Sequence, residues 1–177
     1  NTNLAVLDVL TDAFNGLPSQ NFIAGRITRN IWEQSRVGVL FTHGSASGEN
    51  NTLAGADFAF NTSKFRGNKN FSLIGWYLHN WNENPAGSRD AFGFKVDYPN
   101  DLWDWSATYA SYGDAFSPGM GFIQRQGVQT LSLSMSYRPR PERGWFGRTV
   151  WQAFFDFRPT FYWSLAGRLE TYRIYAT

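Results

Sequence analysis

Hydrophobic and polar residues alternate along residues 128–137 of this chain. Leu131, Leu133 and Met135 share one parity, and serines occupy the positions between them. Successive side chains of a β-strand point to opposite faces of a sheet. The segment therefore predicts a strand with one apolar and one polar face.

The same period of two residues recurs along most of the chain. The segments predicted as strands are 3–13, 21–32, 36–43, 53–61, 70–81, 90–98, 102–111, 128–137, 149–158 and 161–170. Many of them exceed the average of about 5–6 residues for strands of globular sheets and approach the roughly 9–11 residues of a tilted strand that crosses a bilayer. Because no helical period intervenes, we predict an all-β, antiparallel up-and-down transmembrane β-barrel, complete or part of a larger one.

The predicted connections alternate in length over the first part of the chain. Glu33–Arg36 and Pro99–Asp101 are tight, whereas 44–51, 82–88 and 112–127 are longer. Membrane barrels place short turns at one end and long loops at the other, so this alternation favours a barrel. The short connection at Arg158–Thr160 breaks the alternation, because a long loop is due at this place. A miscounted strand near these residues is the alternative.

The composition favours a membrane-facing sheet. Aromatic residues make up 18% of the 177 residues, and 16 basic residues nearly balance 14 acidic ones. A net charge of +2 gives no strong field for nucleic acid, and the lack of cysteine excludes disulfides and thiolate metal sites. No apolar run is long enough for a transmembrane helix, and alternating strands account for the mean hydropathy of −0.39.

Aromatic residues concentrate on the apolar parity and predict contact with lipid or with the bilayer interface. The candidates are Phe58, Phe60, Phe92, Phe94, Trp103, Trp105, Tyr109, Trp151, Phe155 and Trp163. The alternative is a soluble carbohydrate-binding module, in which exposed tryptophans stack on sugar rings. Because Trp103, Trp151 and Trp163 lie near the ends of predicted strands, we favour rows of aromatic residues at the membrane interfaces.

Charged residues concentrate on the polar parity and predict a lumen in which opposite charges pair across neighbouring strands. The candidates are Arg26, Asp57, Lys95, Asp97, Asp104, Asp156, Arg168 and Glu170. A selective pore or a binding site lined by the same groups is the sharper alternative. Arg29 departs from the pattern because it shares parity with Ile27 and Ile31, so we expect it near an interface or beside a β-bulge.

Catalytic motifs are weak in this sequence. Asp97, Asp101 and Asp104 cluster near a turn, and a carboxylate pair there would suit glycoside hydrolysis, but the turn composition explains them better. His43 and His79 have no neighbours at a metal-ligand spacing, so interfacial positions are the better interpretation. We expect no catalytic residues, no metal and no cofactor.

Five stretches carry a resemblance to a known family: 5–12 (AVLDVLTD), 21–31 (NFIAGRITRNI), 35–42 (SRVGVLFT), 54–60 (AGADFAF) and 116–125 (FSPGMGFIQR). They are similar to the C-terminal barrel of large envelope proteins from Gram-negative bacteria, whose N-terminal module is similar to family 9 carbohydrate-binding modules. The resemblance implies a bacterial outer-membrane location and supplies no catalytic residues. Family barrels are longer, so residues 1–177 would be one partial barrel domain, and the absence of a basic-then-apolar leader fits a processed or truncated form.

Together these observations predict a membrane-embedded channel or anchor in contact with outer-membrane lipid. By analogy with the family, it would serve glycan or nutrient handling, with glycans or other envelope proteins as partners. The alternatives are the soluble carbohydrate-binding module and an envelope-associated glycan hydrolase.

Overall fold

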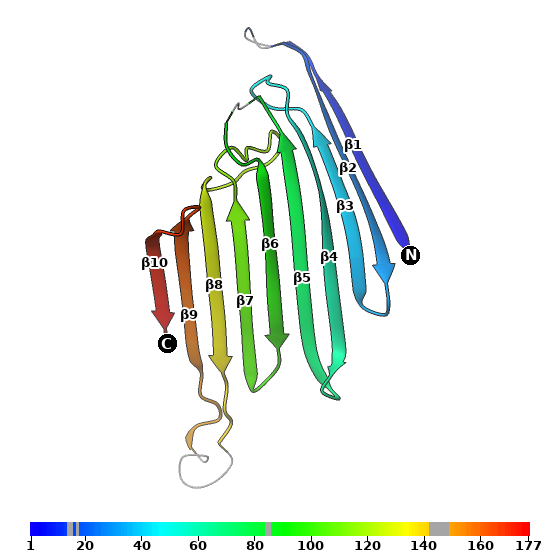
Figure 1. Cartoon of the computed structure of the whole chain (residues 1–177). Helices are drawn as coiled ribbons and strands as arrows, with labels where there is room; N and C mark the ends of the chain where they lie inside the picture. The colour runs from blue at the N-terminus through cyan, green and yellow to red at the C-terminus, as the bar shows by residue number, and fades with distance from the viewer. Residues whose placement is uncertain (14–15, 17, 84–85, 142–148) are drawn as a thin grey trace.

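The computed structural model describes residues 1–13, 16, 18–83, 86–141 and 149–177, which form a single antiparallel sheet of ten strands (Figure 1). The strands follow the order of the chain across the sheet. They are β1 (Thr2–Thr11), β2 (Gln20–Ile31), β3 (Ser35–His43), β4 (Thr52–Phe65), β5 (Lys69–Trp81), β6 (Asp90–Pro99), β7 (Trp103–Tyr112), β8 (Val128–Tyr137), β9 (Phe155–Ser164) and β10 (Leu169–Ala176). The predicted up-and-down all-β topology is therefore confirmed.

The sheet is open, because β1 and β10 each pair with one neighbour alone. Figure 1 shows these two strands at opposite ends of the sheet. The tight turns 32–34, 66–68 and 100–102 lie at its lower end in this view, and the connections 44–51 and 113–127 lie at its upper end. The described residues thus form one open, curved sheet.

The predicted strands 149–158 and 161–170 are wrong in their bounds. One strand, β9, runs through Arg158, Pro159 and Thr160, where we expected a turn, and Trp151 lies before it. Proline lacks an amide donor and normally marks a break. Here the register of β8 with β9 omits Leu133 and Ser134 near Pro159, so the ladder is interrupted while the strand continues. The last strand accordingly begins at Leu169.

The register aligns the apolar parity of neighbouring strands on one face of the sheet. Phe94 pairs with Gly75 on β5 and with Tyr109 on β7, and directly paired residues point to the same side. We call this side the apolar face, and the opposite side the polar face. The apolar face is uncovered by any described element, so Val39 is 52% exposed and Phe94 47% exposed.

A row of aromatic rings follows the lower edge of the apolar face from β4 to β9. The row consists of two groups of contacting rings, one formed by Phe65, Phe71, Tyr98 and Trp105 and the other by Trp103, Tyr137 and Phe155. The contacts, centroid to centroid, are Phe65–Phe71 at 4.8 Å, Phe65–Tyr98 at 6.3 Å, Tyr98–Trp105 at 5.8 Å, Trp103–Tyr137 at 4.3 Å and Tyr137–Phe155 at 6.2 Å. The row places amphipathic Tyr and Trp rings at the margin of the apolar surface.

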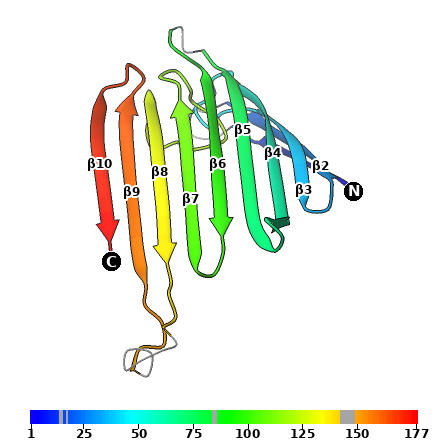
Figure 2. The same cartoon turned by 60° about the horizontal axis from the view of Figure 1, so that its bottom comes forward.

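The sheet bends, and the polar face lies on its concave side. Figure 2 shows β1–β3 turning away behind the rest of the sheet, with the connection between β7 and β8 on that same side. Within the described residues, no helix has the length and hydrophobicity needed to cross a membrane.

Candidate functional site on the polar face

The polar face carries an ion pair that crosses a strand. Arg26 on β2 donates through Nη2 to Oδ2 of Asp57 on β4 over 2.6 Å. Gly38 on β3 lies between them, and a Cβ at this position would stand 2.9 Å from Asp57 Oδ2 and 3.1 Å from Arg26 Nη2. The missing side chain therefore leaves the space in which the two charges meet.

Other charges on the polar face are also paired. We expected such pairs to cross neighbouring strands, but Lys95 and Asp97 pair along one strand, β6. Lys95 Nζ lies 2.7 Å from Asp97 Oδ2, and Arg138 Nη2 donates to Asp104 Oδ2 over 3.0 Å. Asp156 accepts a hydrogen bond from the Ser136 hydroxyl. Because these charges balance locally, the lower part of the face combines paired ions with the hydroxyl groups of β7 and β8.

The two remaining polar candidates lie near the upper end of β10. Arg168 is exposed in the turn between β9 and β10, and Glu170 lies at a β-bulge. Glu170 pairs with Arg125 of the β7–β8 connection. The charged candidates therefore do not converge on one point, and they are distributed over the polar face and this rim.

Asp97, Asp101 and Asp104 each face a different cation. Asp101 lies in the turn between β6 and β7, where Arg140 donates two hydrogen bonds to its carboxylate. These bonds lower the pKa of Asp101 below its usual 3.8. Among the described residues, no group of three or more His, Asp or Glu side chains is arranged to hold a metal ion.

The upper part of the polar face differs from its lower part, because apolar side chains form a cluster there. Leu40, Leu78 and Trp76 surround Leu53 and Ala91 there. Segment 70–81 carries aromatic residues on both parities, and this cluster explains the position of Trp76 on the polar parity. The polar parity of β5 becomes apolar where another segment covers it.

Residues 113–127, which we call the strap, provide this cover. Phe116 of the strap is 1% exposed and packs into the cluster around Leu53. A cavity of about 350 Å³ remains between the strap and β3–β7, lined among others by Leu40 and Ile123. A second cavity of about 320 Å³ lies between residues 122–125 of the strap and polar-face side chains of β8 and β9, including Tyr162.

Two buried asparagines anchor the strap. Asn80 Nδ2 donates to Asn51 Oδ1 over 2.8 Å and to Thr52 O over 3.0 Å, while its Oδ1 accepts from Ser117 N over 3.1 Å. Asn51 Nδ2 donates to Ser117 O over 2.8 Å, and Gly119 N donates to Asn51 Oδ1 over 3.0 Å. Because buried amide groups need hydrogen-bond partners, these contacts fix the backbone of the strap at one position.

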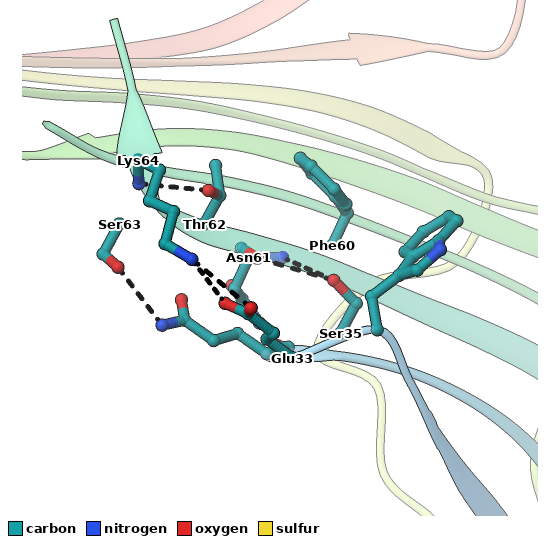
Figure 3. A pocket seen from close by; sticks show the side chains of 9 residues that line it. Glu33, Ser35, Phe60, Asn61, Thr62, Ser63 and Lys64 are labelled. Carbon is teal, nitrogen blue, oxygen red and sulfur yellow. Dashed lines mark hydrogen bonds and ion pairs between the residues drawn. The ribbon is translucent and has the colours of Figure 1, made fainter. Parts of the chain in front are cut away.

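A notch at the lower end of the sheet forms where β4 extends beyond the turn between β2 and β3 (Figure 3). Asn61 N donates to Ser35 Oγ over 3.2 Å, and Asn61 Nδ2 donates to Gln34 O over 3.0 Å. Lys64 pairs with Glu33 at 2.9 Å. These groups satisfy one another across the end of the β3–β4 ladder, so the notch is explained by strand pairing.

Polar contacts on the apolar face occur at its upper margin. Asp90 accepts a hydrogen bond from Tyr77, and His79 Nδ1 lies 2.7 Å from Asp90 Oδ1. His43 Nδ1 lies 2.8 Å from Thr52 Oγ1. Both histidines are thus at strand ends and bonded to neighbours.

Nine of the ten aromatic candidates lie on the apolar face as the parity predicted. These are Phe58, Phe60, Phe92, Phe94, Trp103, Trp105, Tyr109, Phe155 and Trp163. The exception is Trp151, which precedes β9 and is 85% exposed. Arg29 pairs with Val37 close to the lower end of β2, with no shift in the β2–β3 register.

Sequence reasoning missed the strap, which we predicted merely as one of the longer connections. Phe116, Met120 and Ile123 are apolar residues in this connection, and Leu40 and Leu53 are apolar residues on the polar parity. These two departures from the pattern were the available signal.

No family model, no curated protein and no solved structure matches the chain.

Proposed function

We propose that this sheet is part of the wall of an outer-membrane β-barrel that acts as a channel. Its apolar face contacts lipid tails and its polar face lines a water-filled lumen. The observation that carries the proposal is the uncovered apolar face, in which large hydrophobic side chains stay exposed over neighbouring strands. Soluble monomers rarely expose apolar patches larger than a few hundred Å².

The dimensions of the strands support this proposal. β6 has ten residues, which gives a length of about 33 Å. A tilt of about 35–45° reduces its height to about 25 Å, which is the height of the apolar band of membrane barrels. A strand of the length of β6 is thus long enough to cross the hydrocarbon layer.

The margins of the apolar face support it as well. The lower margin carries the aromatic row that includes Tyr98, Trp105 and Tyr137. The upper margin carries Tyr77 and His79 with their partner Asp90. Amphipathic rings favour the level of the lipid headgroups, so both margins suit the two bilayer interfaces.

The carbohydrate-binding alternative accounts for fewer of these features. A sugar platform needs a few exposed rings among hydrogen-bonding groups. Here the exposed rings are continuous with aliphatic side chains such as Val39 and Leu133 over the height of the sheet. The resemblance to envelope proteins supports the outer membrane as the location, and glycan or nutrient handling stays a proposal by analogy.

Reconstitution into lipid vesicles tests the proposal. We expect the protein to need detergent for monodispersity, to insert into vesicles, and to release a small polar solute faster than protein-free vesicles do. A protein that is monodisperse in plain buffer and does not associate with vesicles would instead support the soluble module.

A further inference from the structure

The strap lies on the concave side of the sheet and not beyond its upper end. Phe116 packs against the polar-face residues Leu53 and Ala91, and Ile123 packs against the same cluster. Figure 2 shows the connection between β7 and β8 on the side toward which β1–β3 turn. The strap therefore occupies space that the curved sheet partly encloses.

The strap reaches most of the width of the sheet. At one side it is bound to Asn51, in the connection between β3 and β4. At the other side Arg125 pairs with Glu170 on β10. Because the strap is attached near β3 at one end and near β10 at the other, it passes across most of the strands on the concave side of the sheet.

The attachment at Asn80 is saturated. Its side-chain amide donates to Asn51 Oδ1 and Thr52 O, and its oxygen accepts from Ser117 N and Asn82 Nδ2. An asparagine side chain offers two donors and two acceptor sites, so all four are used. Asn80 is 0% exposed, which makes each of these bonds costly to lose.

Close packing also holds the strap at Gly119. A Cβ at this position would lie 2.9 Å from Asn51 Cβ and would also meet the carbonyl oxygen of Gly44. A larger residue cannot take this place while the strap keeps its position. The seat therefore depends on both hydrogen bonds and shape.

We propose that the strap narrows the lumen and sets the size limit for the solutes that pass. This inference rests on the proposed function, because it needs the polar face to line a lumen. Below the strap the face presents hydroxyl groups, including Ser106, Thr108 and Ser134, and locally balanced charges. The solutes that fit this lining are small, hydroxyl-rich and without net charge.

Vesicle swelling with neutral sugars of graded size tests the inference. The probes are arabinose, sucrose, raffinose and stachyose, and the variants are Asn80→Asp, which keeps the shape but loses two donors, and Gly119→Val. We expect both variants to raise the entry of raffinose and stachyose several-fold relative to arabinose. Asn61→Ala, which removes hydrogen bonds at the lower notch, is the matched control and should leave the size limit unchanged.

The outcomes separate the two proposals. If wild-type protein admits arabinose and neither Asn80→Asp nor Gly119→Val changes the size limit, the role of the strap is overturned. The proposal of a channel is then still supported. Wild-type protein closed to all four sugars, with variants that admit them, would show that the strap closes the lumen and would support the inference. Inserted protein through which no sugar passes in any variant would overturn both. Two different substitutions are used so that a folding defect in one of them does not decide the result.

Discussion

Gly38 separates the two partners of the Arg26–Asp57 ion pair. Both side chains are partly exposed, and exposed pairs contribute about 0–1 kcal/mol. The pair therefore matters less for its own energy than for the consequences of filling the space between its partners. A side chain on β3 would displace two charges on neighbouring strands at once.

We predict that Gly38→Val lowers the free energy of unfolding by about 1–3 kcal/mol, because the new methyl groups overlap the ion pair. Gly25→Val is the matched control, since a Cβ there meets nothing within 4 Å and valine is favourable in strands. Denaturant titration of the protein in detergent micelles measures both effects. Equal losses for the two variants would contradict the role given to Gly38.

The turn between β6 and β7 gives a prediction about pH. Hydrogen bonds from Arg140 lower the pKa of Asp101 in the folded protein. A lowered carboxyl pKa stabilises the fold above the unfolded value of 3.8, and this contribution is lost as the pH falls through the lowered pKa. We predict that Arg140→Gln raises the pKa of Asp101 toward 3.8.

An NMR titration of the Asp101 carboxyl carbon measures this change. Arg140→Lys keeps the charge but loses the forked geometry of the guanidinium, so it should give an intermediate pKa. An Asp101 titration that is the same in all three proteins would contradict the contact between this turn and Arg140.

At the scale of elements, β8 shows the two faces most clearly. Leu133 lies on the apolar face opposite Ala107, and Ser134 lies on the polar face opposite Ser106. The two residues are neighbours near the middle of one strand and point to opposite sides of the sheet. They are therefore a matched pair for a test of lipid contact.

We predict that Leu133→Arg impairs assembly in a bilayer by about 2–4 kcal/mol, the cost of arginine near the membrane midplane, and that Ser134→Arg impairs it far less. Phe94→Arg on β6 should behave as Leu133→Arg does. Refolding into lipid vesicles, followed by protease protection, measures the difference. Equal effects at 133 and 134 would contradict the assignment of the faces.

The strand pattern was predictable because strands such as β6 and β8 carry large apolar side chains on one parity and mostly small or polar residues on the other. The bounds of β9 were not predictable, because Pro159 is a local signal for the end of a strand. The strand nevertheless continues through Pro159, since this residue and its neighbours pair with β10. The strap was not predictable for the same kind of reason. Its seat depends on Asn51, Asn80 and Phe116, which are far apart in the sequence and meet through the fold.

At the scale of the whole molecule, the open edges decide how the sheet is completed. β1 and β10 run in opposite directions, as the order of an even-numbered meander requires, and each has one unpaired edge. Backbone donors that face hydrocarbon without partners cost several kcal/mol each. In a bilayer both edges must therefore pair, with each other or with further strands.

We predict that the amides of β1 and β10 exchange hydrogen in membrane-inserted protein as slowly as those of central β5. Hydrogen exchange followed by mass spectrometry measures this, with the protein in detergent-free buffer as the comparison. Fast exchange along both edge strands in the inserted protein would contradict a closed wall.

Contact between the apolar face and lipid tails is the central claim, and the lack of cysteine allows a direct measurement of it. Spin labels on single cysteines at positions 131–135 of β8 report their accessibility to oxygen, which enters lipid, and to a water-soluble nickel chelate. We expect high oxygen accessibility at Leu131, Leu133 and Met135, and high nickel accessibility at Ser132 and Ser134. Labels at the three apolar positions that neither reagent reaches would show a protein interior in place of lipid and would contradict the account.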